Sequence, residues 1–268
     1  MSLLSVHLRS TRDDSYKIVI EPGSLAGLPK RLLSLAEGKR IAVVTDRMVE
    51  KLYGKRLLRA LASHDSRTRL FSFPSGERAK TRRTKERLED ALLSSGYGRD
   101  SLLVALGGGV VGDLVGFLAA TLHRGVPFVQ VPTTLLAMAD SSVGGKTGVD
   151  TPAGKNLIGA FWQPLEVVMD PLLLSTLPRR QITAGAAEIA KHGVIADKAL
   201  FHFVEKNLER LLAGDPQVVS RALLASCKIK AGVVSKDERE GGLRQILNFG
   251  HTIAHALELA RGYQLLHG

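Results

Sequence analysis

The chain has 268 residues, of which 44% are hydrophobic and 24% are charged. This composition predicts one or two folded domains and excludes a disordered, collagen-like or coiled-coil chain. Lysine and arginine number 37 against 26 acidic residues, and the resulting net charge of +11 favours an anionic partner, whether nucleic acid, a membrane surface or a phosphorylated or carboxylated small molecule.

Short β-branched runs alternate with helical periodicity through the first two-thirds of the chain. Strands are expected at 16–21, 39–46, 67–74, 101–107, 126–134 and 165–170, and helices at 48–63, 84–95 and 110–122. Strand, helix and strand in this spacing predict right-handed crossovers and a mostly parallel sheet.

The β signal stops after Pro171, and helices are expected at 179–195, 198–213, 216–235 and 243–261. We therefore predict an α/β protein: a Rossmann-like, mostly parallel sheet domain over 1–172, followed by an all-α domain over 173–268. A cleft is expected beside the junction.

The N-terminal segment and the apolar runs of the chain do not suggest export or membrane insertion. No run approaches the roughly 20 apolar residues of a spanning helix, and the N-terminal apolar run is too short for a signal peptide. The single cysteine, Cys227, excludes an intrachain disulfide and a two-cysteine zinc site, and is interpreted as a small buried side chain. A cytoplasmic protein without membrane contact is expected.

A glycine-rich turn follows the predicted strand at 101–107. Gly107, Gly109 and Gly112 form a GxGxxG pattern at the start of a helix, where glycines let the backbone approach a pyrophosphate at the helix N-terminus. The pattern predicts dinucleotide binding, with a tight structural turn as the alternative. The acidic residue expected about 20 positions downstream for the ribose is missing, but Asp46 ends an earlier strand and is a substitute.

A second glycine-rich stretch begins at Gly144. Asp140 stands where a phosphate-binding P-loop has its first glycine, which excludes that motif. Lys146, Lys155 and Asn156 nevertheless offer ammonium and amide donors. The sequence allows two interpretations of this stretch, an anion-binding site and a solvated hairpin.

The helical part carries the ligand types of an open zinc site. Glu188 and Lys191 share one helix face, as do His251 and His255, while His267 lies beyond Gly262. One glutamate and two histidines leave a position free for water or substrate. Spacing alone favours His251 with His255 as the histidine pair.

A basic run extends from Arg78 to Arg87. It is interpreted as a solvated helix face and not as a nucleic-acid site, because no aromatic residues interleave with the charges.

Five blocks occur in this order along the chain: GGGVVGDLVGFLAATLHRG, VPTTLLAMADSSVGGKTGVD, GKNLIGAFWQP, AGAAEIAKHG and LNFGHTIAHALE. Together they resemble the 3-dehydroquinate synthase family of the shikimate pathway, within the sugar-phosphate cyclases. The resemblance implies a lyase that converts 3-deoxy-D-arabino-heptulosonate 7-phosphate to 3-dehydroquinate and phosphate, with NAD and one divalent metal, zinc or cobalt. NAD would take a hydride and return it after phosphate elimination, and an aldol step would close the ring.

The resemblance also implies residue roles. Glu188, His251 and His267 would bind the metal, in place of the His251 and His255 pair. Asp140, Lys191, Asn248 and His255 would be catalytic, with His255 beside the phosphate. Substrate contacts would come from Arg124, Lys146, Asn156, Lys230 and Arg244. NAD contacts would come from Asp46, Glu77, Lys80, Gly108, Gly109, Val110, Asp113, Thr133, Thr134, Lys146, Lys155 and Thr176.

Three further expectations follow from the resemblance. Arg124 would reach the neighbouring subunit's site, which implies a homodimer. The family continues where this chain stops, at Gly268, so the helical domain is expected to be incomplete and activity of this chain is an open question. The alternatives are a sedoheptulose 7-phosphate cyclase, a metal-dependent NAD alcohol dehydrogenase, and a non-catalytic anion-binding protein.

Overall fold

A parallel six-stranded sheet forms the centre of the N-terminal part. The computed structural model describes residues 13–261 and 265–268. The strands are β1 (Lys17–Ile20), β2 (Arg40–Asp46), β3 (Arg69–Phe73), β4 (Ser101–Gly107), β5 (Phe128–Pro132) and β8 (Glu166–Met169). Their order in the sheet is β1-β8-β5-β4-β2-β3, and every pair is parallel. The predicted fold class is confirmed.

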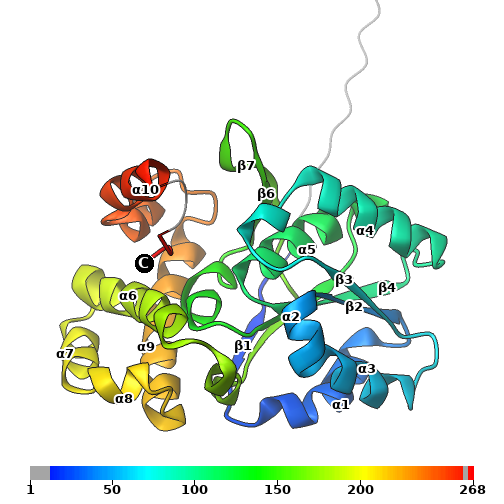
Figure 1. Cartoon of the computed structure of the whole chain (residues 1–268), viewed down its shortest axis with the longest axis horizontal. Helices are drawn as coiled ribbons and strands as arrows, with labels where there is room; N and C mark the ends of the chain where they lie inside the picture. The colour runs from blue at the N-terminus through cyan, green and yellow to red at the C-terminus, as the bar shows by residue number, and fades with distance from the viewer. Residues whose placement is uncertain (1–12, 262–264) are drawn as a thin grey trace, which may run out of the picture.

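Helices cover both faces of this sheet (Figure 1). On one face α1 (Ser24–Ala36) and α3 (Lys55–Ala62) pack on Val43 and Val104, and on the other α4 (Arg82–Ser94) and α5 (Gly109–Thr121) pack on Ala42 and Leu103. Neighbouring residues of β2 and β4 thus face opposite sides, as strand geometry requires. Burial on both sides explains why these strands are continuous apolar runs.

From Pro171 onward the described chain is helical, with all its elements beside the carboxyl end of the sheet (Figure 1). The elements are η5 (Pro171–Thr176), α6 (Arg179–Ala196), α7 (Lys198–Lys206), α8 (Leu208–Leu212), α9 (Pro216–Lys236), η6 (Leu243–Asn248) and α10 (His251–Ala260). Val167 and Met169 of β8 belong to the same buried cluster as Ile189 of α6 and Leu223 of α9. The helical part therefore packs directly on the sheet.

Three predicted helices are interrupted. The helix expected at 48–63 is α2 (Arg47–Val49), a π-helical turn η1 (Glu50–Gly54) and then α3. The helix expected at 198–213 breaks at Asn207, whose side-chain amide donates to the Phe203 carbonyl of its own helix. The helix expected at 243–261 breaks at Gly250, which adopts φ 80 between η6 and α10.

Two elements were not assigned from the sequence. One is α1, and the other is the antiparallel hairpin of β6 (Lys146–Thr151) and β7 (Gly154–Phe161). Gly148 and Gly159 face each other across it, and a Cβ at Gly159 would lie 1.9 Å from the Thr147 carbonyl oxygen. The stretch therefore forms a hairpin, and whether Lys146, Lys155 and Asn156 on it bind an anion stays a prediction.

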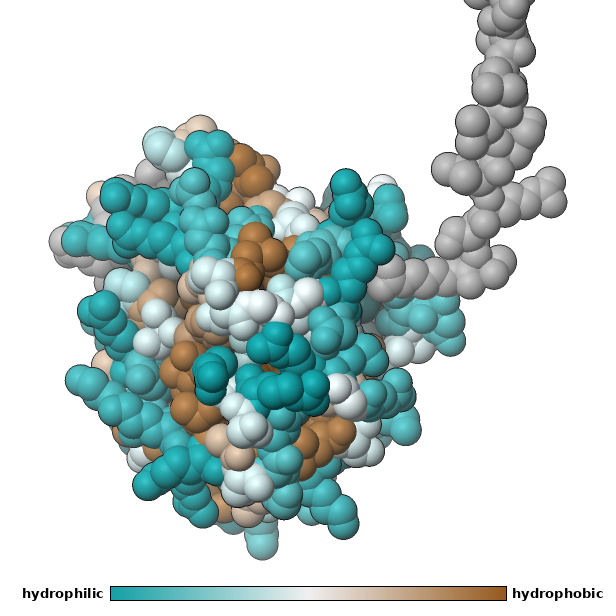
Figure 2. Space-filling model, turned by 90° about the vertical axis from the view of Figure 1, so that its right-hand side faces the viewer, coloured by the Kyte–Doolittle hydropathy of each residue, from teal (hydrophilic) through white to brown (hydrophobic). Residues whose placement is uncertain are grey.

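Connecting turns complete the described part. They are η2 (Glu77–Ala79), η3 (Leu122–Arg124) and the π-helical η4 (Ala137–Ser141). Arg82, Arg83 and Arg87 of α4 are exposed, as a solvated face requires, whereas Lys80 of the same basic run is buried. Figure 2 shows that side of the molecule as mainly hydrophilic, with small separated apolar spots. In the described ranges no helix is both long and apolar enough to cross a bilayer.

The packing of α6 on η4 gives a stability test. A Cβ at Gly185 of α6 would lie 2.5 Å from the Leu136 backbone nitrogen, whereas one at Gly232 of α9 meets nothing within 4 Å. We expect Gly185→Ala to lower the free energy of unfolding by about 1–3 kcal/mol through overpacking. Gly232→Ala, the matched control, should raise it by up to about 1 kcal/mol. Urea denaturation measures both, and equal behaviour of the two variants would contradict this account of the α6–η4 contact.

Candidate functional site

Glu188, His251 and His267 converge on one point from three places in the helical part. Glu188 is buried on α6, His251 begins α10, and His267 lies after that helix. Glu188 Oε1 is 4.0 Å from His251 Nε2 and 3.6 Å from His267 Nε2. One donor atom from each residue lies within 4.8 Å of the other two. The donors, two imidazole nitrogens and a carboxylate oxygen, suit a zinc-type divalent cation.

The structure thus brings together the three residues that the resemblance implies as ligands. The backbone of His255 belongs to α10, but its side chain lies outside the described residues, so its predicted phosphate contact stays a prediction. Burial, followed by the charge of Lys191, lowers the pKa of His251 below its ordinary value. That shift favours the neutral imidazole, which is the form that binds a metal.

Lys191 lies one turn after Glu188 on α6 and its ammonium contacts Glu188 Oε2. The two oxygens of one buried carboxylate therefore have separate partners: Oε2 faces an ammonium and Oε1 faces two imidazoles. This places a cationic proton donor beside the candidate metal position.

A second buried ion pair joins α9 to η4. Lys230 donates to the Asp140 carboxylate and, at 2.6 Å, to its backbone carbonyl. Burial acts to raise the pKa of Asp140, but the charge of Lys230 outweighs the effect of burial, and the pKa is lowered.

Cys227, one turn before Lys230, donates its thiol to the Met138 carbonyl at 3.6 Å. Burial raises the pKa of this thiol to about 12, as suits a packing residue and not a nucleophile.

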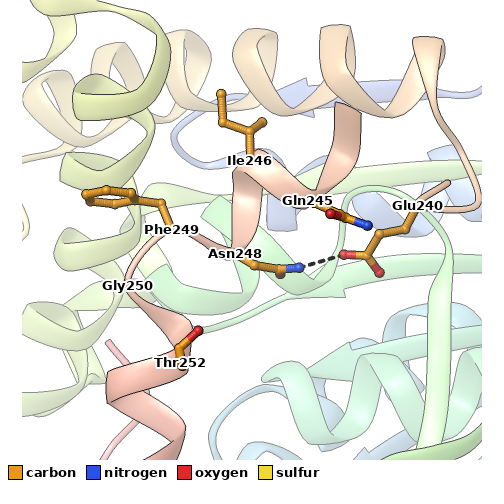
Figure 3. A pocket seen from close by; sticks show the side chains of 7 residues that line it. All are labelled: Glu240, Gln245, Ile246, Asn248, Phe249, Gly250 and Thr252. Carbon is orange, nitrogen blue, oxygen red and sulfur yellow. Dashed lines mark hydrogen bonds between the residues drawn. The ribbon is translucent and has the colours of Figure 1, made fainter. Parts of the chain in front are cut away.

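Glu240 joins a predicted substrate residue, Lys146, to a predicted catalytic residue, Asn248, and was not found from the sequence. Its carboxylate accepts from Lys146 of β6 and, at 2.8 Å, from Asn248 Nδ2, and Figure 3 shows the Asn248 contact at the mouth of a surface hollow beside η6. Burial acts to raise the pKa of Glu240, but Lys146 and Asn248 lower it. Glu240 has φ 62, and neither this conformation nor the tertiary contact has a sequence signal.

Arg244 is almost fully buried, at 2% exposure. Its guanidinium donates to the backbone carbonyls of Glu238 and Gly144, the latter at 3.0 Å. These contacts hold η6 against the start of the hairpin. Burial lowers the pKa of Arg244 below its ordinary value.

A cavity of about 580 Å³ lies between the hairpin and the helices. Its walls combine residues of both parts of the chain, including Asp113, Asp140, Lys146, Asn156, Lys191, Lys230, Arg244, Asn248, His251 and His267. Four of these carry positive charge as lysine or arginine. The cavity is therefore suited to a small polyanion next to the metal position.

The predicted cofactor residues gather at the carboxyl ends of the parallel strands. Gly108 precedes α5, at the end of β4, and Thr134 follows β5, where its Oγ1 accepts from the Ala137 amide at 3.1 Å. Asp46 ends β2, and its Oδ1 caps α2 and accepts from Ser75 at 2.6 Å. A Cβ at Gly108 would lie 3.1 Å from Thr134, which leaves little room for a side chain between the two turns. These turns lie at the carboxyl ends of the strands, which is where parallel sheets of this kind bind a dinucleotide.

The remaining predicted cofactor residues lie around the same edge. Gly109 and Val110 open α5, and Thr133 donates its amide to the Gly107 carbonyl at 2.9 Å. Thr176 Oγ1 is 2.6 Å from the Tyr53 hydroxyl, and Lys155 Nζ is 3.7 Å from Glu77. Of the predicted cofactor residues, only Asp113 and Lys146 also line the cavity.

Lys80, a predicted cofactor residue, contacts two residues that line the cavity. Its buried ammonium donates to Asp113 at 2.6 Å and to the side-chain oxygen of Asn156 on the hairpin. Burial raises the pKa of Asp113, and Lys80 opposes that rise. Burial alone would lower the pKa of Lys80, but Asp113 raises it.

Arg124, a predicted substrate residue, lies outside the cavity. It is exposed and does not line the cavity of its own chain. His123, Arg124 and Gly125 have φ 50, 65 and 123, which is an uncommon conformation for the first two.

Comparisons with known proteins agree on one family. The family models described as 3-dehydroquinate synthase N-terminal and C-terminal match residues 70–184 and 185–268. The 3-dehydroquinate synthase of Geobacter metallireducens is 52% identical over 96% of this chain and 71% of its own length.

Solved structures of related cyclases share the fold. A 2-epi-5-epi-valiolone synthase from Streptomyces hygroscopicus, with NAD⁺ and Zn²⁺ bound, is 31% identical with a TM-score of 0.87 over 98% of this chain and 73% of that one. A 2-deoxy-scyllo-inosose synthase with NAD⁺ and Co²⁺ is 28% identical with a TM-score of 0.84 over 92% and 67%.

The Lys80–Asp113 pair gives a test of the inner wall. Lys80→Met would leave the Asp113 carboxylate buried without its cation, and we expect the free energy of unfolding to fall by about 3–5 kcal/mol. The double variant Lys80→Met with Asp113→Asn carries no such charge and should recover part of that loss. Urea unfolding measures the cycle. A single variant as stable as the parent would show that the pair does not hold this wall together.

Proposed function

The chain belongs to the 3-dehydroquinate synthase family, and we propose that the cavity between its hairpin and its helices is where it performs that reaction. The enzyme converts 3-deoxy-D-arabino-heptulosonate 7-phosphate to 3-dehydroquinate and phosphate, with NAD and a divalent metal, zinc or cobalt, as cofactors. One observation carries the assignment of the site: the Glu188, His251 and His267 cluster opens onto the same cavity as four cationic side chains.

The residues present fit both cofactors. Glu188, His251 and His267 would hold the metal, and the turns at Gly108 and Thr134 with Asp46 would hold the dinucleotide. When bound, the metal polarises a substrate hydroxyl and NAD takes up and returns a hydride.

The chain's own cations would bind the two anionic ends of the substrate. Lys230 and Arg244 lie near Asp140 and Gly144, where they would pair with the carboxylate, while Lys146 and Asn156 of the hairpin would hold the phosphate. In this structure Lys146 contacts Glu240 and Asn156 contacts Lys80. Substrate binding would therefore exchange internal partners for substrate oxygens.

Proton handling would fall to residues around the metal position. Lys191 donates to Glu188 Oε2 and lines the cavity, so its ammonium would reach a substrate oxygen held there. Asp140 would stay ionised because Lys230 lowers its pKa. Asn248 and His255 complete the proposed catalytic set.

The alternatives receive less support. The chain is 52% identical to the Geobacter 3-dehydroquinate synthase and 31% identical to the valiolone synthase. Sequence identity therefore favours 3-dehydroquinate synthase activity over the activity of a related cyclase. A sedoheptulose 7-phosphate substrate has no carboxylate, so Lys230 and Arg244 would face a neutral group.

Two finer assignments are proposals as well. A homodimer that shares Arg124 is supported by the exposure of that residue outside its own cavity. A cytoplasmic location is supported by the lone buried cysteine, which needs no oxidising compartment.

Phosphate release tests the proposed site. With NAD far below the concentration of the heptulosonate substrate, we expect many phosphates released per NAD and no net build-up of NADH. Glu188→Ala should lower the rate by at least about 100-fold, since a lost ligand weakens a metal site more than a lost outer partner does. Glu205→Ala, at an exposed glutamate of α7, is the control and should have no effect. Stoichiometric NADH would instead indicate an alcohol dehydrogenase.

Mixed dimers test the shared site. Arg124→Ala and Glu188→Ala chains should each be inactive alone. In a mixed dimer, the chain that retains Glu188 would receive Arg124 from its partner, so random mixing should restore about a quarter of the parent activity. Measuring phosphate release after co-refolding gives the result, and inactivity of the mixture would contradict the shared arginine.

A further inference from the structure

We propose that Glu258 is a positioning residue for the metal site, whose carboxylate fixes the His267 ring with Nε2 turned toward Glu188. This inference rests on the proposed function, because it presupposes that Glu188, His251 and His267 hold a cation. Nothing in the sequence pattern of the ligands pointed to Glu258.

Glu258 lies on α10 seven residues after His251, two helical turns along the same face. It is only 4% exposed. A buried carboxylate is unfavourable unless it has partners, and Glu258 has two. His267 Nδ1 is 2.9 Å from Oε1, and Lys155 Nζ is 3.7 Å from Oε2.

The two ring nitrogens of His267 face different carboxylates. Nδ1 meets Glu258, and Nε2 is 3.6 Å from Glu188 Oε1. Because a carboxylate oxygen accepts, Nδ1 must carry the proton of the neutral ring, which leaves the lone pair on Nε2. A carboxylate behind a ligand histidine also strengthens that histidine as a ligand.

The other histidine is oriented by the backbone. His251 Nδ1 is 3.3 Å from the Phe249 carbonyl oxygen, and the residue begins α10. His267 lies in the described stretch 265–268, which is neither helix nor strand. Besides the ring of His251, whose centroid is 4.9 Å away, the Glu258 carboxylate is a contact that fixes the orientation of the His267 ring, which gives this buried acidic residue a role.

Lys155 extends this arrangement to the hairpin. Its ammonium lies between Glu258 of α10 and Glu77 of η2, 3.7 Å from each carboxylate. Glu258 therefore connects the candidate metal position, through Lys155 of the hairpin, to Glu77, one of the predicted cofactor residues.

Metal affinity is the first measurement. The metal-stripped full chain is titrated with Co²⁺ against a chromophoric chelator. We expect Glu258→Gln, which keeps an acceptor oxygen but loses the charge, to weaken binding about 10-fold, and Glu258→Leu to weaken it toward 100-fold. The matched control is Glu205→Gln, which alters an exposed glutamate 3.2 Å from His202 and should leave the affinity unchanged.

The tautomer of His267 is the second measurement, made on metal-free protein by imidazole nitrogen NMR with His267→Asn for assignment. The parent should show a proton on Nδ1, and Glu258→Leu should show a mixture of tautomers. If Glu258 served only to pack α10, its replacement would not change the ratio of the two His267 tautomers. Thermal unfolding checks each variant, and Glu258→Gln serves if Glu258→Leu does not fold.

The outcomes separate the two claims. Parent-like affinity and an unchanged tautomer in Glu258→Leu, or in Glu258→Gln if only that variant folds, would overturn the role of Glu258 while Glu188→Ala still abolishes binding. A parent chain that takes up no Co²⁺ would overturn the proposed metal site, and the NMR measurement would still decide whether Glu258 holds His267.

Discussion

The buried carboxylate of Glu188 is the interaction on which the rest of the site depends. One oxygen faces Lys191 and the other faces two imidazoles, so a single group brings together α6, α10 and the segment that carries His267. It is 4% exposed, and a carboxylate so far from water needs compensating positive charge. Gly185, one turn before Glu188 on α6, lies against the backbone of Leu135 and Leu136 just before η4, and this contact limits where the carboxylate lies relative to Asp140.

The parallel sheet supplies the second constraint. Parallel strands deliver the residues that follow them to one edge, and here that edge carries Asp46, Gly108 and Thr134. The helical part packs against β8 at the same end. The cavity therefore lies between the hairpin and the helical part, with Asp113 of α5 and Asp140 of η4 in its wall.

Much of this arrangement could be predicted from the sequence, and the reasons for the failures are physical. Strands with continuous β-branched runs and the GxGxxG turn were found, because local pattern determines them. Spacing alone chose His251 with His255 as the pair. The His267 position came only from the family resemblance, since it depends on how the chain returns to α6 beyond α10. Glu240 and Glu258 were missed because their roles arise from contacts with distant residues. The breaks at Asn207 and Gly250 depend on single side-chain and backbone choices that periodicity does not resolve.

The internal partners of the cationic side chains have a consequence for selectivity. Lys146 is already neutralised by Glu240, and Lys230 by Asp140. A chloride or a lone monoanion arriving from solution gains little, because it must displace a counter-ion that is covalently tethered and so has a high effective concentration. At the proposed site, a molecule with two anionic ends at the right separation would compete at both places at once, so the cavity would discriminate by the distance between charges as well as by their sign.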